Sequence, residues 1–122
     1  MALGKAIGDY DLKMTSVDHA EDGSSITCNF EGPATGFGTV LGTMIFRGGA
    51  PDKAGVCSWR SQAFLDNGDQ NQGTGEGTWD EVGKHQWRVR LLLRTSDGQI
   101  IASDGKLDLA SRTLKGKILE WS

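Results

Sequence analysis

Chain-reversal signals recur at short intervals along this sequence, and they limit the length of any single element. They are the dipeptides Asp22-Gly23, Gly48-Gly49, Asn67-Gly68, Val82-Gly83 and Asp97-Gly98, with weaker turns at Pro51-Asp52-Lys53 and Ala110-Ser111-Arg112. Glycine, asparagine and aspartate favour turns because they adopt positive φ at low steric cost. Between the turns, every window of about a dozen residues with helical apolar spacing is interrupted by glycine. The pattern predicts β-strands and no helix.

Cutting the chain at these turns leaves eight candidate strands, approximately over residues 8–18, 24–32, 36–47, 54–65, 70–81, 84–95, 99–109 and 112–121. Short strands joined by hairpin turns indicate an antiparallel meander. Eight strands can close into a barrel just wide enough for side chains or one small ligand, and closure removes exposed sheet edges. We therefore expect an all-β chain with residues 1–122 as one small β-barrel domain. The alternative is a two-sheet β-sandwich.

Glycine is unusually frequent, at 18 of the 122 residues, and part of it falls inside expected strands. The third and fifth expected strands contain Gly36, Gly38, Gly42, Gly73, Gly75 and Gly77. Glycine inside a strand destabilises it by roughly 0.5–1 kcal/mol relative to alanine, so these positions need a structural reason. We expect sharp coiling of the sheet, or close approach of a bulky side chain such as Trp59, Trp79 or Trp87. Neither a helix signal nor a Lys-Ser/Thr pair follows residues 73–77, which excludes a phosphate-binding loop.

The sixth expected strand alternates clearly between two faces. One face carries His85, Trp87, Val89, Leu91 and Leu93, and the other carries Lys84, Gln86, Arg88, Arg90 and Arg94. Successive side chains of a strand point to opposite faces, so the apolar set is expected inside the barrel. The seventh expected strand places acidic residues outside, where they can pair with the arginines. The arginine row is therefore interpreted as a solvated face.

The two faces of the fourth expected strand differ less. Cys57, Trp59, Ser61, Ala63 and Leu65 make the better core face, and Val56, Ser58, Arg60, Gln62 and Phe64 make the other. If the second face points inward, Arg60 and Gln62 are buried polar groups that need partners, and Glu76 is the natural counter-ion. Such a pair would anchor a ligand. If that face points outward, both residues lie in solvent.

Four residues are candidates for acid–base chemistry: Tyr10, Arg60, Glu76 and His85. Tyr10 alternates in phase with Leu12 and Met14 and could donate a hydrogen bond in the lumen. A histidine near the barrel mouth could act as acid or base, because its pKa is near neutrality; a purely structural role at the rim is the alternative. The candidate ligand-binding residues are Trp59, Trp79, Trp87, Tyr10, Arg60 and Gln62, although the same aromatic residues also describe a packed core.

Charge and cysteine content exclude several classes of partner. Thirteen Lys and Arg against sixteen Asp and Glu give a net charge of −3, whereas nucleic-acid binding and electrostatic membrane anchoring both favour basic excess. The first eight residues lack the apolar core of a signal peptide, which predicts a cytoplasmic protein with Cys28 and Cys57 as free thiols. The cysteines and histidines show no ligand spacing, so neither a metal nor a cofactor is expected.

The eight-strand meander, the glycine-rich strands and the segment Gly75-Glu76-Gly77-Thr78-Trp79 resemble the small calycin-type and allene-oxide-cyclase-like antiparallel β-barrels. The resemblance is architectural and covers most of the chain. The lipocalin Gly-x-Trp signature is absent, since Trp59 is the first tryptophan, and there is no room for the two-helix lid of fatty-acid-binding proteins. The resemblance implies a barrel that binds a hydrophobic small molecule, which some such families rearrange or cyclise. It transfers no catalytic residue.

Three hypotheses about function follow. The first is a barrel that binds a small, largely apolar ligand, which requires a cavity larger than one water molecule. The second is an isomerase, cyclase or lyase, which requires at least two of the four acid–base candidates to converge around one cavity. The third is a ligand-free structural or oligomerisation module, whose homo-oligomer interface would contain Ile100, Ala102, Leu119 and Trp121.

Overall fold

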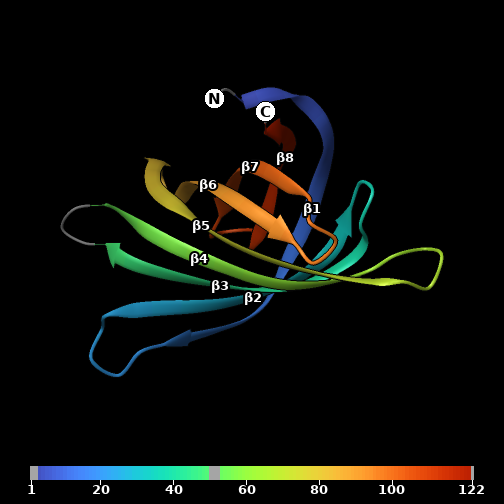
Figure 1. The fold of residues 1–122 in the computed structure, drawn as a ribbon. Helices are drawn as coiled ribbons and strands as arrows, with labels where there is room; N and C mark the ends of the chain where they lie inside the picture. Colours follow the sequence, from blue (N-terminus) through green and yellow to red (C-terminus); the bar gives the residue numbers. More distant parts are fainter. Residues whose placement is uncertain (1–2, 50–52, 122) are drawn as a thin grey trace.

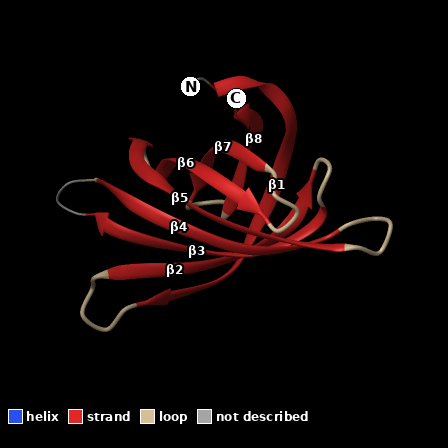
Figure 2. Cartoon of the chain, in the orientation of Figure 1, coloured by secondary structure: helices blue, strands red, loops and turns tan. Residues whose placement is uncertain are grey.

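The computed structural model describes residues 3–49 and 53–121, which form eight antiparallel strands in a closed barrel (Figure 1). Each strand pairs with the next along the chain, and the last pairs with the first. The described residues contain no helix (Figure 2), and hence none that is long and apolar enough to span a membrane. The all-β meander and its closure into a barrel are confirmed. The strands are β1 (Leu3–His19), β2 (Ser25–Ala34), β3 (Gly38–Gly49), β4 (Ala54–Phe64), β5 (Gln70–Gly83), β6 (Gln86–Thr95), β7 (Ile100–Asp108) and β8 (Thr113–Trp121).

Strand pairing brings the apolar faces together inside the barrel. Met44 of β3 lies opposite Trp59 of β4, and Phe46 lies opposite Cys57. All four side chains are buried, which settles the orientation of β4: its face with Cys57 and Trp59 points inward. On β6, Val89 and Leu91 are buried and the arginines are exposed, as the alternation predicted.

The outward faces of β6 and β7 are tied together by charge. Arg88 donates two hydrogen bonds to Asp104, from Nε at 3.0 Å and from Nη2 at 2.7 Å. Arg90 forms an ion pair with Asp80 of β5 at 3.2 Å. These contacts confirm that the arginine row has acidic partners on neighbouring strands. Because these groups are largely solvent-exposed, the pairs contribute little to stability.

Aromatic side chains fill one end of the barrel. The ring centroids of Trp79 and Trp87 are 4.4 Å apart, and Phe46 meets Trp87 edge-on at 5.2 Å. The indole Nε1 of Trp79 donates a hydrogen bond of 2.9 Å to the carbonyl oxygen of Arg47, which satisfies the polar end of a buried ring. This end, next to the β3–β4 and β5–β6 connections, is therefore closed by packed rings.

Glycine makes room for these bulky residues. A Cβ atom at Gly42 would overlap the ring of Trp59, which confirms the expected close approach at that position. A Cβ at Gly77 of β5 would collide with the carbonyl oxygen of Arg90 on the adjacent strand, so there the backbones themselves approach closely. Gly36 lies outside the strand in which it was expected: it occupies the β2–β3 turn with φ of 80°, and β3 begins at Gly38.

Two predicted turns are displaced in the structure. The Val82-Gly83 prediction is wrong, because β5 continues through Gly83 and the reversal is made by Lys84 and His85. His85 adopts a φ of 58° in this turn, a left-handed conformation that histidine tolerates better than most side chains. Gly48-Gly49 belongs to the end of β3, and of the predicted Pro51-Asp52-Lys53 turn only Lys53 lies within the described residues.

The first strand is longer than predicted, because it begins at Leu3 and not near residue 8. Its pairing with β8 shifts register on both sides of Ala6, and its pairing with β2 shifts between Met14 and Ser16. Such bulges bend a strand and increase its local twist. The strand β1 pairs with β8 from Leu3 to Lys13 and with β2 from Tyr10 to His19, and these two pairings close the barrel.

Candidate functional site

The barrel contains a cavity of about 80 Å³ on the side away from the packed aromatic end. One water molecule needs roughly 10–15 Å³ of such space, so the cavity exceeds a single water. Its deep wall is apolar and is made by inward side chains of five strands. These are Leu12, Met44, Trp59, Leu91 and Leu114.

A hydroxyl pair forms the polar part of the deep wall. The phenol oxygen of Tyr10 on β1 lies 2.7 Å from the hydroxyl oxygen of Ser103 on β7, and either can donate the hydrogen bond. The phenol crosses β8 to reach Ser103, and it passes over Gly116 and Gly105, where a Cβ atom would collide with it. Burial raises the pKa of Tyr10 to about 12. The phenol is therefore protonated at neutral pH.

The polar groups at the cavity mouth are bonded to one another. Asn71 of β5 accepts a hydrogen bond of 2.6 Å from the hydroxyl of Ser96, and the hydroxyl of Thr95 donates to Asp97. The backbone of Gln72 is bonded to Ser96 in both directions. These bonds hold the β6–β7 turn against β5. They fix the rim of the cavity, and they occupy the side chains of Asn71 and Thr95.

The structure separates the residues that the sequence analysis grouped as ligand-binding candidates. Tyr10 and Trp59 lie in the cavity wall. Trp79 and Trp87 belong to the aromatic cluster at the other end of the barrel. The side chains of Arg60 and Gln62 lie on the outer face of β4 and are exposed, so the inward alternative for these two residues is wrong.

The acid–base candidates do not converge on the cavity. Glu76 is exposed on the outer face of β5. His85 lies in the exposed β5–β6 turn, so the prediction that it shares a strand face with Trp87 is wrong. With Arg60 also outside, Tyr10 alone of the four lines the cavity. No two of these four candidates therefore converge around the cavity.

Arg60 and Gln62 do share a second hollow, on the outside of the barrel. It measures about 450 Å³ and lies across β1 to β5, with Glu31 and Thr43 among its other walls. Some of its polar groups are hydrogen-bonded to one another: the Thr43 hydroxyl donates a hydrogen bond of 2.6 Å to the Asn29 side chain. The hollow is an open polar groove, in contrast to the apolar cavity inside.

The two cysteines are free, as expected, and both are fully buried. Cys28 lies opposite Met44 and Cys57 lies opposite Phe46, so the strand β3 separates their own strands. Burial raises the pKa of each thiol to about 11. A thiol that is buried and protonated is a poor nucleophile, so both act as core residues. Among the residues of the described ranges, no three His, Cys, Asp or Glu side chains are grouped to hold a metal ion.

Sequence reasoning did not identify Ser103 as part of a site. The available signal was a serine between the inward residues Ile101 and Gly105.

The eight-stranded closed antiparallel barrel is compatible with a calycin-like architecture. Comparison with known proteins finds no matching protein-family model, no similar curated protein and no similar solved structure.

Proposed function

We propose that the protein binds one small, largely apolar molecule in the barrel cavity. The observation that carries the proposal is a cavity of about 80 Å³ with apolar deep walls, in a barrel whose other end is packed with rings. Protein interiors leave few voids larger than a water molecule. An empty cavity of this volume destabilises a fold on the order of 2 kcal/mol, and a bound apolar molecule would recover part of that stability.

The architecture supports the same function. The resemblance to small calycin-type and allene-oxide-cyclase-like barrels implies a lumen that holds a hydrophobic small molecule. Isomerase, cyclase or lyase activity has less support, because Tyr10 lines the cavity without a second acid–base candidate and its pKa of about 12 makes it a weak acid. A cytoplasmic location and the absence of nucleic-acid and membrane partners stay predictions.

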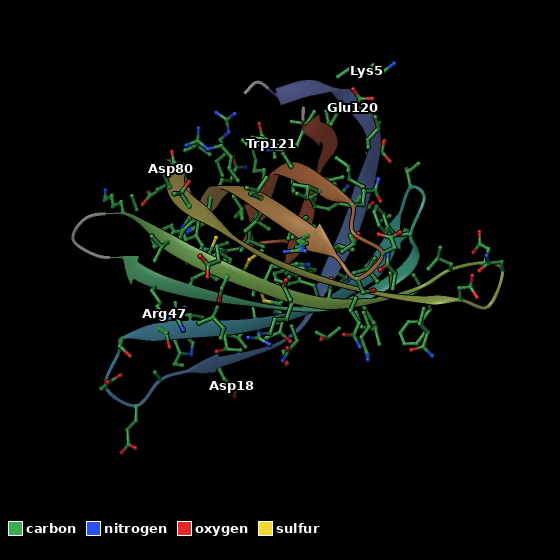
Figure 3. All side chains as sticks on the ribbon, viewed as in Figure 1. Lys5, Asp18, Arg47, Asp80, Glu120 and Trp121 are labelled. Atoms are coloured by element: carbon green, nitrogen blue, oxygen red, sulfur yellow. The ribbon has the colours of Figure 1, made fainter. Side chains whose placement is uncertain are left out.

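A homo-oligomer is the second candidate function, and the outer face of β6 to β8 favours it. Leu92 lies opposite Ala102, and Ala102 lies opposite Leu119, so an apolar row crosses three strands on the outward face, with Ala102 itself buried and Leu119 half-buried. Leu92 is 43% exposed, and Ile100 beside this row is 47% exposed. Trp121 lies on the same strand as Leu119, near the end of β8, where Figure 3 labels it. Light scattering of the purified protein tests this candidate, and a monomeric mass would count against it.

Native mass spectrometry of freshly purified protein tests ligand binding and assembly together. We expect a retained adduct, or else binding of a small apolar probe such as cyclopentane, measured by NMR titration. The variant Ala63→Met fills the cavity from β4 and should abolish probe binding without loss of folding. Gln62→Met is the matched control, because the neighbouring side chain points outside and the probe should still bind. Equal probe binding by both variants would contradict a site in the cavity.

A further inference from the structure

The Tyr10 and Ser103 hydroxyls in the cavity wall together have two hydroxyl hydrogens, and the hydrogen bond between them uses one. Tyr10 and Ser103 each carry one O–H group, and the 2.7 Å contact between their oxygens consumes one of the two hydrogens, whichever residue donates. Within the described residues, this contact is the single side-chain hydrogen bond that either hydroxyl makes. One O–H donor is therefore left over in the wall of an apolar cavity.

The cavity carries no compensating charge. None of the described side chains that line it belongs to Asp, Glu, Lys, Arg or His. The nearest acidic influence on the pair is Asp104, which lies on the opposite, outward face of β7 in an ion pair with Arg88. Burying a carboxylate or an ammonium group without a partner is strongly unfavourable. Ionised ligands, including the carboxylates of fatty acids, do not match this cavity.

We infer that the ligand is a neutral molecule with a hydrogen-bond acceptor, of the ketone or aldehyde class, whose oxygen accepts the spare hydrogen of the Tyr10–Ser103 pair. The inference rests on the proposed function and adds the chemistry of the ligand to it. Trp59, Met44 and Leu91 contact its apolar body. The cavity is smaller than the ~150 Å³ that encloses benzene, so it takes a compact single ring or short chain that extends toward the mouth.

The pair also determines which variants are informative. Tyr10→Phe leaves the Ser103 hydroxyl free to donate, and Ser103→Ala leaves the Tyr10 phenol free. Each single variant therefore keeps one donor of this pair, and the double variant Tyr10→Phe/Ser103→Ala removes both. A set of three probes reads out the chemistry: cyclopentanone, its hydrocarbon isostere methylenecyclopentane, and cyclopentanecarboxylate.

NMR titration of the wild type and the three variants with these probes tests the inference. We expect the double variant to bind cyclopentanone about fivefold to tenfold more weakly, as expected for one lost hydrogen bond. Each single variant should lose less, and the affinity for methylenecyclopentane should stay the same or increase. Hydrocarbon binding also shows that the double variant keeps its fold and cavity. The carboxylate should bind more weakly than the ketone to every variant.

Different failures have different meanings. If the double variant weakens the ketone and the hydrocarbon equally, or if the carboxylate binds as tightly as the ketone, the inference about the ligand is overturned while a binding cavity remains. If neither neutral probe binds the wild type and native mass spectrometry shows no adduct, the proposed function is overturned, and the inference falls with it.

Discussion

Tyr10 places a phenol among apolar side chains, and its ionisation reports directly on that burial. It is the only tyrosine in the chain, so the increase in absorbance near 295 nm that accompanies phenol ionisation reports on this residue alone. We expect a titration midpoint of about 12 in the folded protein, raised mainly by burial, and about 10 in urea. The Ser103 hydrogen bond lowers the pKa, so Ser103→Ala should not bring the midpoint down. A folded-state midpoint near 10 would show that the phenol is solvated and outside the cavity.

The same shift has a defined effect on stability. Between pH 10 and pH 12 the unfolded chain has released the phenolic proton and the folded chain still holds it. The contribution of Tyr10 to stability is therefore complete below pH 10 and decreases as the pH rises to about 12. Denaturant unfolding over this range should show a decrease of about 1.4 kcal/mol per pH unit from this group. Tyr10→Phe should lack this component of the decrease.

Gly42 shows how one missing methyl group positions a cavity residue. Gly42→Ala would push the new Cβ into the buried ring of Trp59, so we expect a loss of about 1–3 kcal/mol in the free energy of unfolding in urea. Gly73→Ala is the control on the same inward row, because its Cβ would meet only the Ser61 hydroxyl, at 3.0 Å. It should change stability by less than about 1 kcal/mol. Equal losses in the two variants would contradict the Trp59 contact.

The β5–β6 hairpin depends on the left-handed conformation of His85, with φ of 58°. His85→Gly should raise the free energy of unfolding by up to about 1 kcal/mol, because glycine adopts this φ without strain. His85→Val should lower it by about 1–2 kcal/mol, because β-branched residues disfavour this conformation. Thermal unfolding checks both. Val82→Gly, in the adjacent strand, is the control and should destabilise. A stabilising valine at position 85 would place the turn elsewhere.

The strands β4 and β6 show how far the alternation of side chains in a sequence predicts which face of a strand points inward. The alternation on β6 was decisive because arginines contrast sharply with Val89 and Leu91. On β4 it was not, since Val56 and Phe64 are apolar residues on the exposed face. The pairing of Met44 with Trp59 resolves that face, and pairing is a property of two strands together. The turn was misplaced because Val82-Gly83 carries a stronger local turn signal than a histidine in left-handed conformation.

The candidate site was less predictable than the fold. Tyr10 and Trp59 could be placed inside from alternation within their own strands. The contact between Tyr10 and Ser103 could not be predicted, because Ser103 lies 93 residues away in sequence and meets Tyr10 only after the barrel closes. Two glycines along this route, Gly116 on β8 and Gly105 on β7, leave room for the phenol. The site is therefore a consequence of closure and register across three strands.

Closure also brings the two ends of the chain together. Leu3 of β1 lies opposite Trp121 of β8, and Figure 1 shows the start of β1 beside the end of β8. A sheet that closes on itself has no unique first strand, because every strand has two neighbours. The barrel and its cavity should therefore survive a change in where the chain starts, provided that the new break falls in an exposed turn.

A circular permutant tests closure of the whole molecule. A short glycine-rich linker joins the present ends, and the new ends lie at Asn67-Gly68, an exposed turn where a Cβ on Gly68 would meet nothing within 4 Å. We expect native-like near-ultraviolet circular dichroism from the Trp79–Trp87 pair, with stability within about 2 kcal/mol of the parent. A second permutant opened between Trp59 and Arg60 should not fold. The break falls in the middle of β4 and interrupts its hydrogen bonding to both β3 and β5. If the turn permutant also fails to fold under conditions in which the parent chain folds, the β1–β8 pairing does not close the barrel in solution.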